Sequence, residues 1–519
     1  LLDFGEKSIM KKFLILFIFF TLIFSFSSTY AQDNSSSSVD VSAYIEEIVV
    51  TARGREESVR DIPVAITVLS EERLNNLSLT TFEDFQTAVL GLHDQLQGGG
   101  NAALYGRYTL LVPDVMGEDV KQNASANRAK EWAEYNGSET DFIPEDIWEE
   151  FYEAINIANS VINSDFDPGA ELTADFNTLK RQAYGIRGLA YFMLSNFYAQ
   201  PYSFSAGAGH LGVPIVTEFD FQNKPSRSTV AEVYAQVIAD LNQATTLITG
   251  TQKNAGYFSK AAAEAILSRV YLYMEDWTNA ESKATSVINN YGYTLVSRDA
   301  YPTQFIDGLS SEAIFEMIYN QTDNTGSNHI GGMYKITGYG DYLPSNDWYA
   351  LMEDGDIRRT MVTTDSNLIG DFAKLPLGPA RVDKWPSEGP LNGTDNVSII
   401  RLSEVILNRA EARTNLGNDA GAQADVDLIR QRANPGVAAV TATGAALKTE
   451  VYNERRAELA FEGHRIFDIN RRKQNLARVL DCTSVPEACN LSYPNNLFIL
   501  PIPDGETNSN ENISQNPGY

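Results

Sequence analysis

The chain has 519 residues, of which 43% are hydrophobic, a composition typical of a globular protein that buries a large core. It carries 68 acidic against 40 basic side chains, which gives a formal net charge of -28 at pH 7. Nucleic-acid binders use basic side chains to release counterions from phosphates, so this balance argues against DNA and RNA as partners. We interpret the charge as a feature of a solvated, exposed surface, which leaves uncharged ligands open.

The first residues of the chain predict export. Lys11 and Lys12 precede an apolar stretch at residues 13–26, as in a secretory signal peptide. The stretch is shorter than the roughly twenty residues that a membrane-spanning helix needs, which disfavours a permanent anchor. We therefore assign residues 10–31 to a signal peptide and residues 1–9 to translated upstream sequence without a function.

Cys482 and Cys489 are the two cysteines of the sequence, and they lie close together in a Pro-containing segment. In an exported chain this spacing permits a short disulfide, with a pair of free thiols as the alternative. Neither cysteine follows the apolar stretch of the leader. The sequence as given therefore shows no site for an N-terminal lipid.

Residues 32–79 predict a flexible spacer followed by a short strand-rich fragment. The Ser-rich segment 32–41 is too polar to bury enough apolar surface to order itself. The segments 45–52 and 62–69 are rich in β-branched residues and predict two short strands. A helix is expected to start within 71–77.

From about residue 80, apolar residues recur at the spacing of amphipathic helices. In the helix predicted at 176–198, Arg181 and Arg187 fall outside the apolar stripe and are expected to face away from the core. The helices predicted in this part of the chain span 147–162, 176–198 and 230–248.

Two further segments, 260–289 and 399–432, carry small and apolar residues at the spacing of tetratricopeptide helix pairs. These patterns predict a mainly α protein built from stacked helical hairpins, with an ordinary helical core as the alternative. Between residues 291 and 397 the helical period fades, and Gly, Pro, Asn and aromatic residues replace it. Such a long irregular segment on a rigid scaffold is typical of a functional region.

Several motifs in the second half of the chain resemble those of the RagB/SusD nutrient-binding family. The segment 401–412 is similar to its R-L-x-E-x-x-L-x-x-A-E-A helix, and 454–468 is similar to its E-R-x-x-E-L-x-F-E-G-x-R-x-F-D signature. The other matching segments are Ile429-Arg430-Gln431-Arg432-Ala433, Pro501-Ile502-Pro503 and Gln515-Asn516-Pro517-Gly518-Tyr519. Their order and spacing indicate the family more strongly than any one of them alone.

The resemblance covers roughly Asp84 to Tyr519 and implies one nutrient-binding domain at 80–519. It implies a SusD-like α-helical scaffold, with tetratricopeptide-like helices at about 147–290 and 399–470 and a loop-rich ligand region at 291–397. It also implies a protein at the outer membrane and cell surface, which binds an oligosaccharide, a polysaccharide or a peptide. Such a protein covers a TonB-dependent transporter and passes its ligand inward.

The charges of the segment 454–468 predict structure rather than catalysis. Glu454, Glu458 and Glu462 are spaced to share a helix face, with Arg455 and Arg465 available to pair. We interpret them as a fixed lattice of ion pairs.

Another resemblance lies before the nutrient-binding part. The segments 46–53 and 55–66 resemble the coupling box and first plug strand of a TonB-dependent receptor, an element that lends a strand to a partner's sheet. The alternating strands of a receptor barrel are missing from the rest of the sequence. A natural fusion or receptor fragment with a transport role and a hybrid reading frame are the two explanations, and we favour the hybrid.

The loop-rich region supplies the candidate ligand contacts. A sugar oligomer needs flat aromatic faces for its C–H surfaces and planar amide or carboxylate groups for its hydroxyls. The candidates are Tyr334, Tyr339, Asp341, Tyr342, Asn346, Asp347, Trp348 and Tyr349, with Trp385 as a neighbour. The alternative is that Trp348 and Tyr349 belong to a satellite core. The family resemblance also includes Tyr105-Gly106-Arg107 and Pro113-Asp114-Val115-Met116 near its start. The secondary candidates follow this motif in a polar loop and are Asp119, Asn123, Asn127 and Arg128.

An enzyme is the main rival to a binding protein. A glycoside hydrolase needs two carboxylates that face each other across a cleft. The chain is so rich in acids that its sequence alone does not exclude such a pair. However, the four histidines are scattered without metal spacing, and the sequence has no phosphate loop or nucleophile elbow. We expect no catalytic residues, no metal and no cofactor. A purely structural helical-repeat adaptor is the third alternative.

Overall fold

The computed structural model describes residues 49–52, 55–58 and 79–519, except for 99–103, 124–125, 219–222, 247–253, 336–337, 366–367, 369–377, 387–392 and 483–484. The predicted signal peptide and the strand predicted at 62–69 lie outside the described residues. Strand β1 (Val49–Ala52) covers the end of the strand predicted at 45–52 and pairs with β2 (Arg55–Ser58), which the sequence pattern did not indicate.

The first helix of the nutrient-binding part, α3 (Phe82–Gln97), begins with a capping box. The Thr81 hydroxyl accepts a hydrogen bond from the Asp84 backbone N–H at 3.2 Å, and the Asp84 carboxylate accepts one from the Thr81 N–H at 2.7 Å. These bonds satisfy two backbone donors that would otherwise lack partners. Phe85, Val89 and Leu92 then place the apolar face of α3 against the core.

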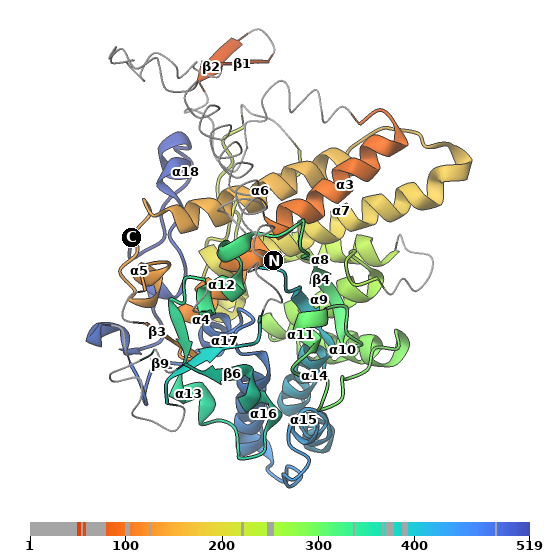
Figure 1. The fold of residues 1–519 in the computed structure, drawn as a ribbon. Helices are drawn as coiled ribbons and strands as arrows, with labels where there is room; N and C mark the ends of the chain where they lie inside the picture. Colours follow the sequence, from red (N-terminus) through yellow and green to blue (C-terminus); the bar gives the residue numbers. More distant parts are fainter. Residues whose placement is uncertain are drawn as a thin grey trace, which may run out of the picture. The chain divides into compact units, whose positions relative to one another are not determined.

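A serial array of helices builds the scaffold, and the prediction of a mainly α fold with stacked hairpins is confirmed. Each helix of the array packs against the next one (Figure 1). Its members are α6 (Phe142–Ile162), α7 (Gly169–Tyr198), α8 (Val230–Thr246), α9 (Lys260–Tyr273), α10 (Trp277–Asn290), α14 (Leu402–Asn415), α15 (Asp419–Ala433) and α16 (Gly444–Leu459). The two predicted helix pairs are α9 with α10 and α14 with α15, and α10 joins them by packing on α14.

Small side chains allow the helices of these pairs to approach closely. Ala280 and Ala284 of α10 are fully buried. Ser268 of α9 is fully buried as well, and its hydroxyl accepts a hydrogen bond from the Asn408 side chain of α14 at 3.1 Å. The bond satisfies two polar groups inside the core and ties one hairpin to the next.

The expectation that Arg181 and Arg187 of α7 face away from the core is wrong. Only 1% of Arg181 and 5% of Arg187 is exposed, because α6 packs on one side of α7 and α8 on the other. Arg187 forms two hydrogen bonds of 2.7 and 2.8 Å with Asp240 of α8. A helix enclosed on both sides buries polar positions that its amphipathic pattern assigns to solvent.

The helix expected to run through 454–468 is interrupted. α16 ends at Leu459 and α17 (Arg465–Arg471) begins six residues later, with Phe461 and Gly463 between them at positive φ values of 68° and 78°. A Cβ atom on Gly463 would lie 2.2 Å from the Thr109 carbonyl oxygen, so only glycine fits this crossing. The break directs α17 onto α4 (Thr109–Val115).

Short strands lie outside the helical array and pair in twos. The antiparallel pairs are β3 (Val120–Gln122) with β5 (Tyr342–Pro344), β4 (Ala313–Met317) with β8 (Val397–Arg401), β6 (Val362–Thr364) with β7 (Ala380–Val382), and β9 (Leu476–Ala477) with β10 (Asn490–Leu491). Short α-helices join them: α5 (Lys130–Ala133), α11 (Gln304–Asp307), α12 (Ile330–Tyr334), α13 (Asn346–Tyr349) and α18 (Asp504–Ser509). The remaining short helices are η3 (Leu104–Tyr108), η4 (Tyr202–Phe204), η5 (Ala206–Ala208), η6 (Gly326–Asn328), η7 (Ile357–Met361), η9 (Pro486–Ala488) and η10 (Asn496–Phe498).

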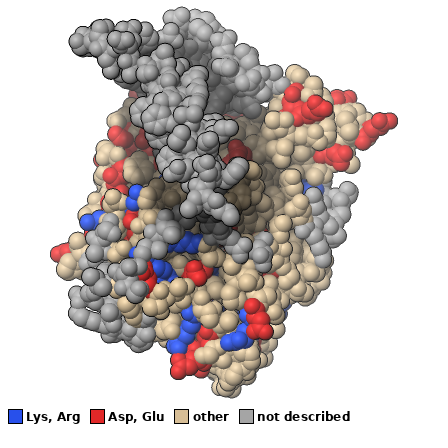
Figure 2. Space-filling model, viewed as in Figure 1, with Lys and Arg blue, Asp and Glu red and all other residues tan. Residues whose placement is uncertain are grey.

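The acidic charge of the chain is spread unevenly over the surface. Figure 2 shows Asp and Glu side chains at the end of the array where α7 begins, and the exposed acids there are Asp165, Asp167, Glu171 and Asp175. Lower in the same view, basic and acidic side chains lie side by side. Within the described residues, none of the helices combines the length and the apolar character that crossing a membrane requires.

Candidate functional site

The pairing of β3 with β5 brings the two sets of predicted ligand contacts together. Val120 lies opposite Pro344 and Gln122 opposite Tyr342, and beyond the strands the Asn123 N–H donates to the Asp341 carbonyl at 2.8 Å. The polar loop that follows β3 therefore lies beside the aromatic loop that precedes β5. Sequence spacing could not reveal this contact, since more than 200 residues separate the two loops.

Tyr339 and Arg128 form the centre of a partly exposed surface. The Arg128 guanidinium carbon lies 3.2 Å from the centre of the Tyr339 ring, and 35% of the Arg128 side chain is exposed. Asp341 fixes the arginine by accepting from its backbone N–H at 3.1 Å and from its Nη1 at 3.3 Å. Asn127 is exposed next to it, and its side-chain oxygen accepts from Arg128 Nη1 at 2.9 Å.

Asn328 completes this surface, and Arg107, which is only 6% exposed, holds Asn328 from inside the fold. The sequence analysis assigned neither residue to the site. The Asn328 side-chain oxygen accepts hydrogen bonds from the Tyr339 hydroxyl and from Arg107 Nη1, both at 3.2 Å. Asn123 donates from its side chain to the Gly340 carbonyl at 3.1 Å. Arg107 belongs to a quoted family motif, which was a usable signal, whereas Asn328 carries none. We call the partly exposed residues Asn123, Arg128, Asn328 and Tyr339 the Tyr339 surface.

Four of the predicted aromatic contacts lie inside the fold. Tyr334, Tyr342, Trp348 and Trp385 are each at most 3% exposed. The Trp348 ring packs on Phe461 with 4.8 Å between centroids, and Tyr334 stacks on Trp385 at 6.3 Å. These buried rings pack inside the fold and support the aromatic loop at residues 334–349. A ligand that approached from solvent would instead contact Tyr339 and Tyr349, which are partly exposed.

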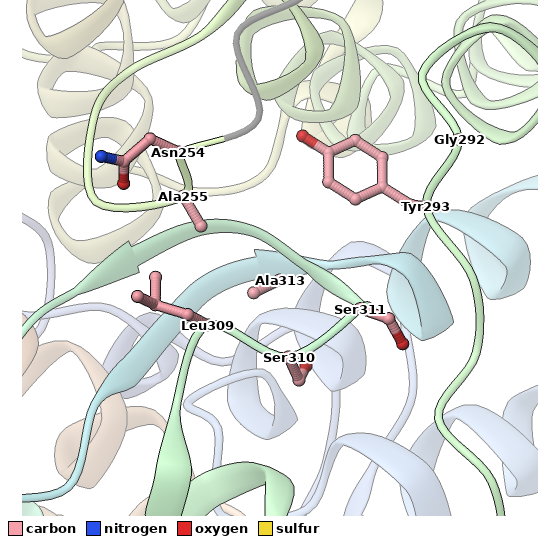
Figure 3. Close-up of a pocket in the computed structure, with 8 residues that line it drawn as sticks. All are labelled: Asn254, Ala255, Gly292, Tyr293, Leu309, Ser310, Ser311 and Ala313. Atoms are coloured by element: carbon pink, nitrogen blue, oxygen red, sulfur yellow. The ribbon is translucent and has the colours of Figure 1, made fainter.

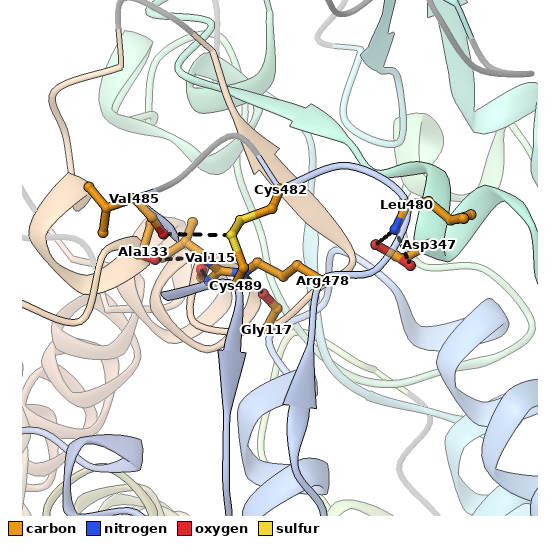
Figure 4. Close-up of a disulfide and its surroundings, with 9 residues drawn as sticks. All are labelled: Val115, Gly117, Ala133, Asp347, Arg478, Leu480, Cys482, Val485 and Cys489. Carbon is orange, nitrogen blue, oxygen red and sulfur yellow. Dashed lines mark hydrogen bonds between the residues drawn. A yellow bond between two sulfur atoms is a disulfide. The ribbon is translucent and has the colours of Figure 1, made fainter. Parts of the chain in front are cut away.

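The predicted polar contacts Asn346 and Asp347 hold the loop that contains Cys482 and Cys489. The structure pairs these cysteines in a disulfide. Asp347 accepts a hydrogen bond from the Leu480 N–H at 3.1 Å (Figure 4). The Asn346 side chain donates to Asp481 at 2.7 Å. Asp481 also pairs with Lys121 of β3. The contacts bind the disulfide loop to the strands beneath the Tyr339 surface.

Arg478 anchors the same loop to the start of the domain. Its guanidinium donates to the carbonyl oxygens of Val115 and Ala133 at 2.8 Å and of Gly117 at 2.9 Å (Figure 4). Burial lowers the pKa of Arg478, and Tyr135 and Glu118 nearby partly offset this effect. One buried cation thus satisfies three carbonyl groups that have no strand partner.

The secondary candidate Asp119 is part of the ion-pair lattice. It is 1% exposed and accepts from Arg456 Nε at 2.5 Å. Burial raises the pKa of Asp119, although Arg456 and Arg465 oppose the shift. An enclosed and paired carboxylate does not reach a ligand in solvent.

The lattice expected around Glu454, Glu458 and Glu462 exists, but its main cations come from other segments. Glu458 is fully buried and contacts Arg401 at 2.8 Å and Arg432 at 2.6 Å. The remaining contacts of the set are Arg401 with Glu462 at 2.7 Å, Lys384 with Glu462 at 2.5 Å, Arg358 with Glu454 at 2.6 Å and Arg430 with Glu454 at 3.0 Å. The break after Leu459 places Glu462 outside the helix that contains Glu458. This explains why cations from other segments, and not Arg455 and Arg465, pair with these acids.

The cations of the lattice keep Glu404, Glu411 and Glu462 ionised. Burial by itself would raise the pKa of Glu462, but Arg401 and Lys384 lower it to about 2. Burial likewise opposes ionisation of Glu404 and Glu411, whose pKa values Arg269 and Arg471 lower to about 2. Carboxylates held in this state are poor proton donors at neutral pH, which fits a structural role.

The histidines in this part of the chain have structural surroundings. His329 is fully buried and caps α12, where its Nδ1 accepts from the Gly331 N–H at 3.1 Å. Burial lowers the pKa of His329 to about 3 and that of His464 to about 4. Across the residues that the structure describes, no group of three or more His, Cys, Asp or Glu side chains is arranged to hold a metal ion.

Two family descriptions match the sequence, and curated relatives match most of it. Residues 379–519 match the description "SusD family", and residues 76–272 match "Starch-binding associating with outer membrane". SusD-like protein P2 of Formosa agariphila is 25% identical over 488 residues, which cover 85% of this chain and 93% of that protein. SusD-like protein P25 of the same organism is 22% identical over 75% of this chain and 82% of its own length.

Solved structures resemble the whole helical part of the chain. A putative sugar binding protein from Bacteroides vulgatus is 31% identical, with a TM-score of 0.76 over 85% of this chain and 99% of that one. A SusD superfamily protein from Bacteroides thetaiotaomicron is 29% identical, with a TM-score of 0.74 over 84% of this chain and 100% of that one. The chain therefore belongs to the RagB/SusD family.

Proposed function

We propose that this protein is a non-catalytic glycan-binding protein of the outer-membrane surface, which captures oligosaccharides and delivers them to a TonB-dependent transporter. The family membership supports this role, and so do the printed descriptions of relatives as starch-binding and sugar-binding proteins. Glu404 and Glu462 of the lattice are paired and hold low pKa values, which removes them as acid catalysts.

The stacked pair of Arg128 and Tyr339 carries the assignment of the ligand surface. The Arg128 guanidinium lies over the Tyr339 ring, with its carbon 3.2 Å from the ring centre, and both side chains remain partly open to solvent. A sugar ring can lay its C–H face on such a platform, while the amides of Asn123 and Asn127 offer partners for hydroxyl groups. Asp341 holds the arginine in position, so little conformational entropy is lost on binding.

Affinity gel electrophoresis against a panel of polysaccharides tests the binding role. The purified protein should be retarded by at least one polymer, and Tyr339→Ala should lose that retardation. Tyr271→Ala on α9 is the matched control, because Tyr271 is another partly exposed tyrosine but lies on the helical array. Retardation that survives Tyr339→Ala unchanged would disprove the assigned surface while leaving the role intact.

Reducing-end assays on the same polymers test the absence of catalysis. Incubation with purified protein should release no new reducing ends over a day. A steady release that follows protein concentration would show that the protein is a hydrolase.

Uptake by cells tests delivery to a transporter. Cells that lack the protein should take up a fluorescent oligosaccharide more slowly than the parent at low ligand concentration. An outer-membrane transporter should also co-purify with the tagged protein. Normal uptake together with no co-purifying transporter would refute the delivery step.

A further inference from the structure

A large hollow lies between the end of α3, the segment before α9 and the end of β4, and its lining includes no residue of the Tyr339 surface. Its volume is about 490 Å³, which is within the range of small-ligand pockets. Leu90, Tyr257, Leu309 and Ile318 contribute apolar surface to it. Asn254 and Asn320 contribute amides, so the lining alternates apolar and hydrogen-bonding groups.

A second hollow of about 410 Å³ shares Asn254 and Leu309 with the first one. Figure 3 shows the Tyr293 ring pointing across this hollow toward Asn254 and Ala255, with Ser310 and Ser311 along the opposite edge. Leu309 stands between the two hollows because it lines both of them. We call the two hollows together the Leu309 cleft.

The exposure of apolar side chains in the cleft is unusual. Leu90, Tyr257 and Leu309 are 54%, 37% and 55% exposed. Large apolar residues that cluster in a concave, solvent-open place mark binding sites more often than isolated exposed residues do.

The backbone of Leu309 is held in a conformation that favours glycine. Its φ is 46°, in the left-handed region that leucine rarely adopts. The Leu309 N–H donates to the Glu316 carboxylate at 2.7 Å, and Ser398 donates to the same carboxylate at 2.8 Å. Glu316 is 3% exposed, so a buried and satisfied acid holds an exposed leucine in a strained position. Strain of this kind is typical of ligand-contacting positions.

The charges of the cleft define the chemical class of its ligand. Among the described residues that line the two hollows there is no lysine or arginine, and the acids Asp94, Glu316 and Asp323 line the larger hollow. An anionic ligand would be repelled by these acids. A purely apolar ligand would leave the amides and hydroxyls without partners. An uncharged sugar ring matches both the apolar and the hydrogen-bonding groups of the lining. Its C–H faces would lie on Tyr257 and Leu309, and its hydroxyls would bond to the amides.

We propose that the Leu309 cleft is a second binding site, specific for uncharged saccharides, on the same chain as the Tyr339 surface. The inference rests on the proposed glycan-binding role and adds a site and a charge class to it. The Tyr339 surface carries the partly exposed cation Arg128, whereas the described lining of the cleft carries no lysine or arginine, so the two sites differ in the sugars that they accept.

Crystals soaked with neutral trisaccharides provide the first test. The probes are maltotriose, cellotriose, xylotriose, mannotriose and laminaritriose, with trigalacturonate as the anionic control. We expect electron density for at least one neutral trisaccharide against Tyr257 and Leu309, and none there for trigalacturonate. Density for the neutral sugars that is confined to the Tyr339 surface would refute the second site and leave the proposed function standing.

The variant Leu309→Gly provides the second test, since it separates a binding role from a structural one. Glycine relieves the positive φ, so the melting temperature should stay the same or rise. Calorimetric titration with the neutral trisaccharide seen in the crystals should show at least a tenfold loss of affinity at the cleft. Leu428→Ala, which changes a 49% exposed leucine on α15, should leave the affinity unchanged.

The combined results separate the two proposals. Loss of sugar affinity in Leu309→Gly, with the affinity of the Tyr339 surface kept, supports the second site. Unchanged affinity in Leu309→Gly and in Tyr257→Ala overturns it. Failure of every polymer in the gel panel and of every trisaccharide would overturn the glycan-binding role itself.

Discussion

The helical lattice around Glu458 and the loop region around Tyr339 bury opposite kinds of side chain. In the lattice, charged groups such as Arg401 and Glu458 are at most 2% exposed, and each has partners of opposite charge. In the loop region the large rings of Tyr334 and Trp348 are buried, while Arg128 stays partly open above Tyr339. Burial therefore follows the availability of partners on neighbouring segments rather than the polarity of a residue in its own segment.

The difference teaches where a ligand can bind. A charge that is already paired inside the lattice has no capacity left for a ligand, and a ring that is packed under a loop has no free face. Both sites that we infer use half-open groups at the edge of such packed regions. Changes that affect either the lattice or the loop region alone test whether the lattice serves stability and the loop region serves binding.

Acidification should have the largest effect, and it should act on the lattice. Glu404, Glu411 and Glu462 have pKa values lowered from the usual 4.5 to about 2. Their stabilising contribution is complete above pH 4.5 and is lost as the pH falls toward 2, because the unfolded chain then binds more protons. Each contributes on the order of 3 kcal/mol. Denaturant unfolding monitored by circular dichroism should show the steepest loss of stability between pH 4.5 and 2.

Asp114 and Glu316 work in the other direction, since burial raises their pKa values. They should reduce the loss of stability on acidification without abolishing it. A free energy of unfolding that stays constant from pH 5 to pH 2.5 would contradict the view that the lattice is ionised and stabilising.

Removal of one lattice cation should cost slightly less. Arg401→Met leaves Glu458 and Glu462 buried without their central partner, and we expect a loss of roughly 3–5 kcal/mol in the free energy of unfolding. Arg298→Ala is the control, because Arg298 pairs with Asp299, whose side chain is 96% exposed, and otherwise donates one hydrogen bond to the Gly355 carbonyl at 3.0 Å. Its loss should cost about 1 kcal/mol or less. Equal effects of the two variants would remove the distinction between lattice and surface pairs.

In the loop region, Trp348→Ala should act through stability. The buried ring packs on Phe461, so its truncation should cost roughly 3 kcal/mol in urea unfolding. Glycan affinity, measured well below the unfolding temperature, should change less than it does in Tyr339→Ala. If the Trp348→Ala protein had normal stability but no longer bound glycan, Trp348 would have to be a ligand contact.

The smallest effect should come from the hydroxyl of Tyr339. Tyr339→Phe removes only the 3.2 Å hydrogen bond to Asn328 and should weaken glycan binding about threefold, whereas Tyr339→Ala should weaken it about tenfold. Isothermal titration with the best ligand of the gel panel measures both. Equal losses in the two variants would mean that the hydroxyl, and not the ring, makes the contact.

Most of the scaffold could be predicted from the sequence because its signals are local. The small residues Ala280 and Ala284 and the turn at Gly417 set the helix pairs within about thirty residues of one another. The break after Leu459 could not be predicted, because it depends on the close approach of Gly463 to Thr109 more than 300 residues earlier.

The candidate site was predictable as a region but not residue by residue. Composition located the aromatic loop and the polar loop at Asn123 and Arg128, and the pairing of β3 with β5 joined them. Which rings face inward depends on Phe461, a residue that no local pattern links to the loop. The disulfide loop, which engages Asn346 and Asp347, is equally remote in sequence.

The crossing at Gly463 has a consequence for any attempt to dissect this protein. The two matched stretches, 76–272 and 379–519, meet there, since the Gly463 N–H donates to the Asp114 carboxylate at 3.1 Å and Arg465 pairs with Glu118. At the far end, the Leu500 N–H donates to the Phe197 carbonyl at 2.7 Å. The two stretches thus contact each other at several points. A fragment that contained only one of them would expose charges that lack their partners, and we expect it to be expressed as an insoluble product.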